Sequence, residues 1–224
     1  SLLTVINEKV YRNGQYTIQL PLKGLIAASN ELPAQGEGLE ALWDRFLIRY
    51  FIGNIEQEFA FDRMIASTKD TEPNIPEKLP IEQEEYCKMR AEAETVTLHY
   101  TFFELVHTIK RTVEQYNTQR DANLPPIYIS DRRWKKIVGL LRTSAYLNES
   151  PAVNFVDCLL IPYCIWDEVS QLPIVENIVQ QAITESINTY LLGEKQLEQK
   201  LDALKEDMKA EHSLREISDP AIPV

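Results

Sequence analysis

Residues 25–33 read LIAASNELP, and residues 39–46, LEALWDRF, follow after a short loop that contains two glycines. The run from position 25 to position 28 is apolar without alternation, which is typical of a strand buried on both faces of a parallel sheet. Because ligands bind beyond the carboxyl ends of the strands in open α/β sheets, we expect Asn30 to lie at a ligand site. Its amide could orient a water molecule against a phosphate oxygen, although capping a turn is the simpler alternative.

A helix is predicted over residues 39–46, with Arg45 near its end. Residue type alone allows this arginine to meet a phosphate or to form an ion pair on the surface. Residues 46–52, FLIRYFI, form a second apolar run and predict another strand. Before both runs, Asn13-Gly14 lies between alternating residues, and this dipeptide is the strongest short signal for a β-hairpin.

Composition and charge narrow the class of protein. The 224 residues carry a net charge of −11, which argues against non-specific binding to nucleic acid or anionic membranes. The three cysteines are unpatterned and the histidines share no ligand spacing, so neither a disulfide framework nor a metal site is predicted. The N-terminus lacks the features of a signal peptide, and no apolar stretch is long enough to span a membrane. We therefore expect a cytoplasmic protein.

The second half of the sequence predicts helices with recognisable starts. Thr101 and the glutamate three residues later fit a capping box, and Asn154 with Asp157 forms a similar pattern. Ser130 is the predicted cap of a helix whose basic residues stand out in an acidic protein. Arg132 lies in its first turn, where the helix dipole disfavours a cation unless an anion is near. That anion could be a nucleotide phosphate or a carboxylate of the acidic helix predicted around residues 80–94.

Taken together, the hairpin, LIAASNELP, LEALWDRFLIR (39–49) and ISDRRWKKIVGLLRTSA (129–145) resemble the MoxR branch of the AAA+ ATPases, and RavA-type regulatory ATPases most closely. The resemblance covers most of residues 1–190. It implies a mixed, mostly α fold, in which the sensor-1 and arginine-finger half of an AAA+ α/β core precedes an all-α lid. The phosphate loop, G-x-x-x-x-G-K followed by Ser or Thr, does not occur in the 224 residues, and neither does the acidic magnesium-binding strand. We therefore expect the downstream part of such an ATPase, inactive alone.

The resemblance also implies roles for individual residues. Asn30 is the sensor-1 residue that orients the attacking water, and Arg45 is the arginine finger that reaches a neighbouring subunit's site. Arg132 is the sensor-2 residue that contacts the γ-phosphate from its own subunit, with Arg133 as the second choice. The hairpin projects toward the pore of a ring, and its exposed side chains are candidates for contact with a protein partner: Tyr11, Arg12, Gln15 and Tyr16.

The implied parent protein is a hexameric ring that uses ATP and Mg²⁺ for chaperone-like remodelling of a protein, with a von Willebrand factor A-domain (vWA) protein as a possible partner. The alternative is a non-catalytic helical adaptor that binds other proteins. The predicted parts are residues 1–55, the end of the α/β core; residues 56–95, linker helices and a proline-rich loop; residues 96–190, the lid; and residues 191–224, an extension helix and tail.

Overall fold

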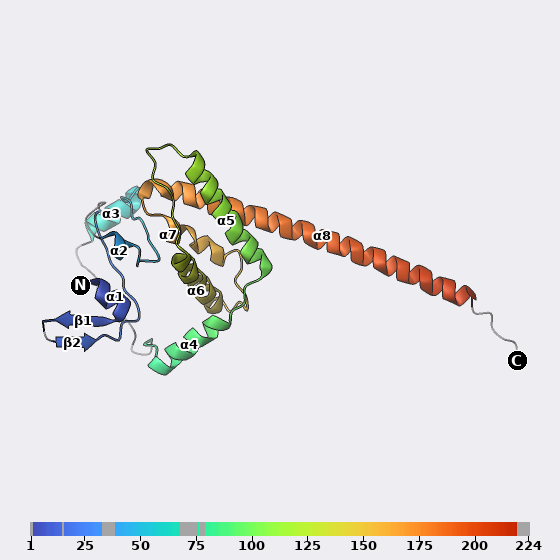
Figure 1. The fold of residues 1–224 in the computed structure, drawn as a ribbon, viewed down its shortest axis with the longest axis horizontal. Helices are drawn as coiled ribbons and strands as arrows, with labels where there is room; N and C mark the ends of the chain where they lie inside the picture. Colours follow the sequence, from blue (N-terminus) through green and yellow to red (C-terminus); the bar gives the residue numbers. More distant parts are fainter. Residues whose placement is uncertain (1, 15, 33–38, 68–75, 77–78, 219–224) are drawn as a thin grey trace.

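The computed structural model describes residues 2–14, 16–32, 39–67, 76 and 79–218. Its elements are α1 (Leu2–Glu8), β1 (Val10–Asn13), β2 (Tyr16–Gln19), α2 (Glu40–Trp43), α3 (Glu58–Ala66), α4 (Gln83–Thr95), α5 (Tyr100–Gln119), α6 (Asp131–Leu147), the 3-10 helix η1 (Asp157–Leu160), α7 (Pro162–Ile165), the 3-10 helix η2 (Val169–Gln171) and α8 (Leu172–Ser218). The fold is mostly α, as predicted, with one two-stranded sheet in the described part. Figure 1 shows α5, α6, α7 and the start of α8 gathered in one body.

The core lies where the apolar faces of α5, α6 and the first turns of α8 meet. The helical spacing of the apolar residues at 102, 105, 106, 109 and 113 predicts one buried face on α5. Four of these positions are buried and Val106 is half-buried, which confirms that face. The fully or nearly fully buried side chains from the other two helices are Ile137, Leu141, Ala145, Val175, Val179 and Ala182. Burial of a leucine or isoleucine side chain contributes about 1.5–3 kcal/mol, so packing rather than helix propensity holds these helices.

One helix start is capped as predicted, and the hydrogen bonds predicted around Asn154 form in the turn just before η1, whose own N-cap, Val156, makes no side-chain cap bond. The Ser130 hydroxyl accepts a hydrogen bond from the Arg133 backbone N–H at 3.2 Å, and α6 follows. The Asn154 side-chain oxygen accepts from the Val156 N–H at 2.8 Å, while an Asp157 carboxylate oxygen accepts from the Asn154 N–H at 3.0 Å. This reciprocal pair begins the segment that leads through η1 to α7.

Two other local predictions shift by one or two residues. Asn13 pairs with Tyr16, so the loop of the hairpin begins at Gly14 rather than at Asn13, and Gly14 takes the positive φ of +59°. Helix α5 begins two residues before the predicted position, with His99 at its N-cap and no side-chain cap bond. Thr101 therefore lies inside the first turn, and the capping box predicted there is wrong.

The strands predicted at residues 25–28 and 46–52 do not form. Ile26 is 98% exposed and Ile52 is 81% exposed, so neither run is buried on both faces. A buried strand needs hydrogen-bonded neighbours, and the part of the chain that the structure describes pairs only β1 with β2 in a sheet. Without such neighbours, both runs are irregular chain.

Helix α8 runs without a break past residue 190, where the lid was predicted to end. Figure 1 shows its first turns against α5 and its later turns extending away from the body. Leu201 and Leu204 on the extended part are 54% and 59% exposed. None of the described helices combines the length and the apolar character needed to cross a membrane. The division into residues 96–190 and 191–224 stays a prediction.

Cysteine reactivity tests the packing of the helical body. Cys87 is exposed, whereas burial raises the pKa of Cys158 to about 12 and that of Cys164 to about 11. Because the thiolate is the reactive form, a disulfide reagent near pH ~8 should modify one thiol per native chain and three after denaturation. Rapid reaction of all three thiols in the native chain would contradict this packing.

The buried thiols also predict how stability depends on pH. Above the ordinary thiol pKa of 9.0 the unfolded chain loses the thiol protons of Cys158 and Cys164 while the folded chain keeps them, so the free energy of unfolding should fall as the pH rises further.

Candidate functional site

Arg45 lies two residues beyond α2, in a turn that continues from it. The Arg45 backbone N–H donates to the Leu42 carbonyl at 3.0 Å. Its guanidinium is held from two sides: Nε donates to the Asn7 side-chain oxygen at 2.8 Å, and Nη1 lies 3.4 Å from Asp44 Oδ2. The side chain is 20% exposed, so a small part of it reaches the surface while the two contacts fix its direction.

The two arginines at the start of α6 lie in opposite environments. Arg133 is 4% exposed; its Nη2 lies 3.1 Å from Asp44 Oδ1, and its Nη1 lies 3.4 Å from Asp167 Oδ1. Arg132 is exposed and makes no hydrogen bond or ion pair with the described residues. The contrast arises because adjacent helical residues point about 100° apart. Arg132 is therefore available to an external anion, whereas Arg133 is already paired with two carboxylates.

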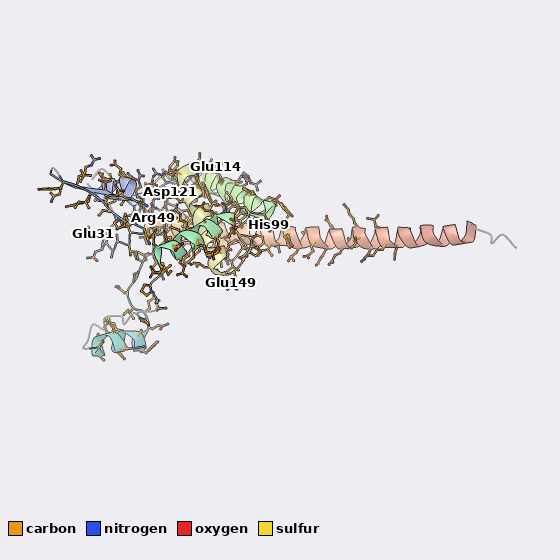
Figure 2. All side chains as sticks on the ribbon, turned by 90° about the horizontal axis from the view of Figure 1, so that it is seen from below. Glu31, Arg49, His99, Glu114, Asp121 and Glu149 are labelled. Carbon is orange, nitrogen blue, oxygen red and sulfur yellow. The ribbon has the colours of Figure 1, made fainter. Side chains whose placement is uncertain are left out.

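Arg49 belongs to the same site, although the sequence analysis did not single it out. It is 3% exposed, and its Nη1 donates to the Trp166 carbonyl and to Asp167 Oδ1, while Nη2 donates to the Trp43 carbonyl at 3.1 Å. Its own carbonyl accepts from the Trp166 indole N–H at 3.3 Å. Figure 2 labels Arg49 within the body of side chains. The available signal was a single charged residue inside the apolar run at 46–52.

Aromatic contacts strengthen this junction. The Arg49 guanidinium carbon lies 4.4 Å from the centre of the Trp43 ring, a cation–π distance. The Trp43 and Trp166 rings meet edge to face, with centroids 5.9 Å apart. Residues 43–49 are therefore docked onto the helical body through both charge and apolar area.

The backbone at Asp167 is held in place by a buried glutamine. Gln171 is 1% exposed, and its side-chain oxygen accepts from the backbone N–H groups of Asp167 and Glu168 at 2.8 and 3.2 Å. Its side-chain nitrogen donates to the carbonyls of Pro125 and Pro126. The loop before η2 is thereby fixed, and with it the backbone of the residue whose carboxylate Arg49 and Arg133 share.

Cations outnumber carboxylates at this junction. The cationic cluster consists of Arg45, Arg49, Arg132, Arg133 and Lys136, and its carboxylates are Asp44 and Asp167. Burial is the main cause that lowers the pKa of Lys136, and the charge of Arg132 lowers it further. Asp44 acts in the opposite direction and raises the pKa, whereas Arg45 and Arg133 also lower it. Burial and then Arg133 lower the pKa of Arg49. The buried Nε groups of Arg49 and Arg133 have no hydrogen-bond partner among the described residues. Because these Nε atoms are buried, it is the exposed Arg132 that offers positive charge to an external anion.

Asn30 is not brought to this cluster. It lies in an exposed bend, where the neighbouring Ser29 hydroxyl accepts from the Glu31 N–H at 3.3 Å. Within the described ranges no hydrogen bond or ion pair links Asn30 to Arg45 or Arg132. Figure 2 labels Glu31 on the outside of the body. The strand that was predicted to position Asn30 does not form, so its place at a ligand site stays a prediction.

The hairpin has one apolar and one polar face. Its register places Tyr11 opposite Ile18, and Tyr16 lies on the same face because strand residues alternate. These three side chains are 46%, 54% and 77% exposed in the order Tyr11, Ile18, Tyr16. Arg12 lies on the other face and pairs with Glu8 at 3.3 Å. Gln15, also a candidate contact, lies outside the described residues.

Comparison with known families covers both parts of the chain. Residues 1–90 match the MoxR domain found in MoxR–vWA–β-propeller ternary systems, and residues 101–179 match the AAA lid domain. The chain belongs to the MoxR family of AAA+ ATPases. The cationic cluster of this MoxR chain lies where the two matched regions meet, since Arg45 and Arg49 come from the first and Arg132 and Asp167 from the second.

Two proteins of Methanocaldococcus jannaschii show the extent of similarity to whole chains. The chain is 33% identical to the uncharacterized protein MJ0079 over 179 residues, which are 80% of this chain and 43% of that protein. It is 34% identical to the uncharacterized protein MJ0812 over 168 residues, which are 75% of this chain and 41% of that protein. The chain thus spans about two fifths of the length of these relatives.

Proposed function

We propose that this MoxR chain supplies the arginine finger and the sensors of a ring-forming ATPase that remodels a protein partner. The observation that carries the proposal is the cationic cluster, in which Arg45 is directed by Asn7 and Asp44 while Arg132 remains unpaired within the described structure. Catalysis of phosphoryl transfer is mostly positioning plus stabilisation of negative charge, so guanidinium groups held at a surface suit it. An adaptor has no evident need for this excess of positive charge in a protein whose net charge is −11.

We assign the sensor-2 role to Arg132 rather than Arg133. Arg133 already contacts two carboxylates and is 4% exposed, so contact with a nucleotide would require it to leave them. Arg132 needs no such rearrangement. We propose that Arg132 contacts ATP bound to its own subunit, whereas Arg45 reaches ATP bound to the neighbouring subunit.

The residues present fit the phosphate part of ATP better than its metal. Guanidinium groups bind phosphate through charge-assisted hydrogen bonds, and Arg132 is exposed without a partner among the described residues. In the described residues no group of three His, Cys, Asp or Glu side chains could hold a metal ion, so we assign no Mg²⁺ ligand here. Bound Mg²⁺ would neutralise phosphate charge; the role of Arg45 would be to stabilise the charge that develops during transfer.

A vWA protein is the partner we propose, because the matched MoxR domain is described from systems that contain one. We propose the apolar face of the hairpin, Tyr11, Tyr16 and Ile18, as a contact surface for a protein partner or substrate. Three exposed apolar side chains on one face of an isolated hairpin have no partner in the described structure that would cover them. We also propose Asn30 as the residue that orients water once its segment is ordered at a nucleotide.

Arg132→Ala in the full-length ATPase tests the proposed function. A hydrogen bond to a charged group is worth about 1.5–3 kcal/mol, so the Kd for ATP should rise about 10- to 100-fold, and turnover should slow. The matched control is Lys110→Ala, which removes an exposed cation from α5 rather than from the cationic cluster. Binding would be followed by calorimetry and turnover by phosphate release. Equal, small effects of both variants would favour the adaptor.

A further inference from the structure

An alternating series of charges runs from the helical body to Arg45. We call it the ionic chain, and its members in order are Arg49, Asp167, Arg133, Asp44 and Arg45. Neighbouring members lie 2.5 Å, 3.4 Å, 3.1 Å and 3.4 Å apart between their closest paired atoms, and each neighbouring pair is opposite in sign. Arg45 also donates a hydrogen bond to the side-chain oxygen of Asn7, near the end of α1.

The two halves of the ionic chain differ in burial. Arg49 and Arg133 are almost fully buried, and Arg49 is further fixed by two backbone carbonyls. Asp44 is 47% exposed, and its carboxylate is divided between two arginines: Oδ1 faces Arg133 and Oδ2 faces Arg45. One half-exposed carboxylate therefore joins a rigid, buried cation of the lid to the cation that we propose as the finger.

We propose that Asp44, anchored by Arg133, is a positioning residue that fixes the direction of Arg45 relative to the lid. The finger would then move with the lid helices as one body. This inference rests on the proposed function of Arg45. An arginine side chain that is free in solvent samples many rotamers, and misplacement of a catalytic group by about 1 Å can cost about 100-fold in rate. Because Asp44 contacts both Arg45 and the buried Arg133, it reduces the number of rotamers that Arg45 samples before the nucleotide binds.

A purely structural role for Asp44 makes a different prediction. Its contact with Arg133 Nη2 has the distance of an ion pair but not the alignment of a hydrogen bond. Ion pairs that are partly exposed to solvent contribute little to stability. Loss of the Asp44 charge should therefore leave the lid folded, because Arg133 keeps its contact with Asp167. The effect should appear in the rate and not in the melting temperature.

The test uses the full-length ATPase and the variants Asp44→Asn and Asp44→Glu. We expect Asp44→Asn to lower kcat about 10- to 100-fold, with KM for ATP and the melting temperature close to wild type. Asp44→Glu keeps the charge and should recover part of the lost rate. Asp202→Asn is the matched control: it removes an exposed carboxylate that pairs with Lys205 on α8, and it should leave kcat unchanged.

A double variant distinguishes action through Arg45 from a general effect. In the Arg45→Ala background, Asp44→Asn should cause no further loss of residual turnover, because its effect passes through the missing guanidinium. Additive losses, or a loss of rate that follows a large fall in melting temperature, would overturn the positioning role. So would wild-type kcat in Asp44→Asn while Arg45→Ala is inactive. Full activity of Arg45→Ala would instead overturn the proposed function of the finger.

Discussion

Replacing the proposed finger, Arg45, by alanine in the full-length protein should lower kcat for ATP hydrolysis about 1,000-fold or more while ATP binding stays close to wild type. Arginine fingers are worth about 10³–10⁵ in kcat, because they stabilise charge that develops only in the transition state. In this chain the guanidinium of Arg45 is already held by Asn7 and Asp44, so its direction is fixed before phosphate arrives. Single-turnover phosphate release and equilibrium ATP binding would separate the two effects.

The control for Arg45→Ala is Arg90→Ala. Arg90 is 68% exposed on α4 and forms a single ion pair with Glu94, so its loss removes the same charge without touching the cationic cluster. We expect wild-type turnover from this variant. An Arg45→Ala protein that binds ATP and still hydrolyses it at more than about a tenth of the wild-type rate would contradict a finger of the usual strength.

The second large effect concerns the stability of the helical body. Leu141 on α6 is completely buried, so Leu141→Ala should lower the free energy of unfolding of the chain by about 2–5 kcal/mol through lost burial and a cavity. Leu147→Ala on the same helix is the control, because Leu147 is 63% exposed and surface changes stay within about 0.5 kcal/mol. Urea denaturation followed by circular dichroism would measure both. Equal losses in the two variants would show that α6 does not face the core as described.

The helices could be predicted from the sequence because their determinants are local. Apolar spacing on α5 and the Ser130 cap of α6 depend on residues within a few positions of each other, and the structure confirms both. The strands could not be predicted in the same way. The apolar run at residues 25–28 has the composition of a buried strand, but a strand forms only beside a hydrogen-bonded neighbour, which sequence pattern alone does not supply.

The residues of the cationic cluster could be anticipated in part, while their functional roles stay predictions. Resemblance pointed to Arg45 and to the pair Arg132 and Arg133. It could not say which member of the pair is buried, because that depends on carboxylates at positions 44 and 167, far away in the chain. Arg49 was missed because it lies in a run whose apolar neighbours predicted a strand. A charged residue inside such a run can indicate that no strand forms or that a buried ion pair is present. Arg49 shows both, since residues 46–52 form no strand and its side chain pairs with Asp167.

Mixed rings give the most direct test of the claim that Arg45 acts on ATP held by a neighbouring subunit. Full-length Arg45→Ala subunits would be mixed with subunits whose phosphate loop cannot bind ATP, and phosphate release would be measured across a range of ratios. Each variant alone should be inactive, and mixtures should recover activity, because an intact finger from one variant then meets an intact nucleotide site of the other. Mixed assembly would be verified by co-purification of differently tagged subunits. Verified mixed rings without recovery at any ratio would contradict the shared site.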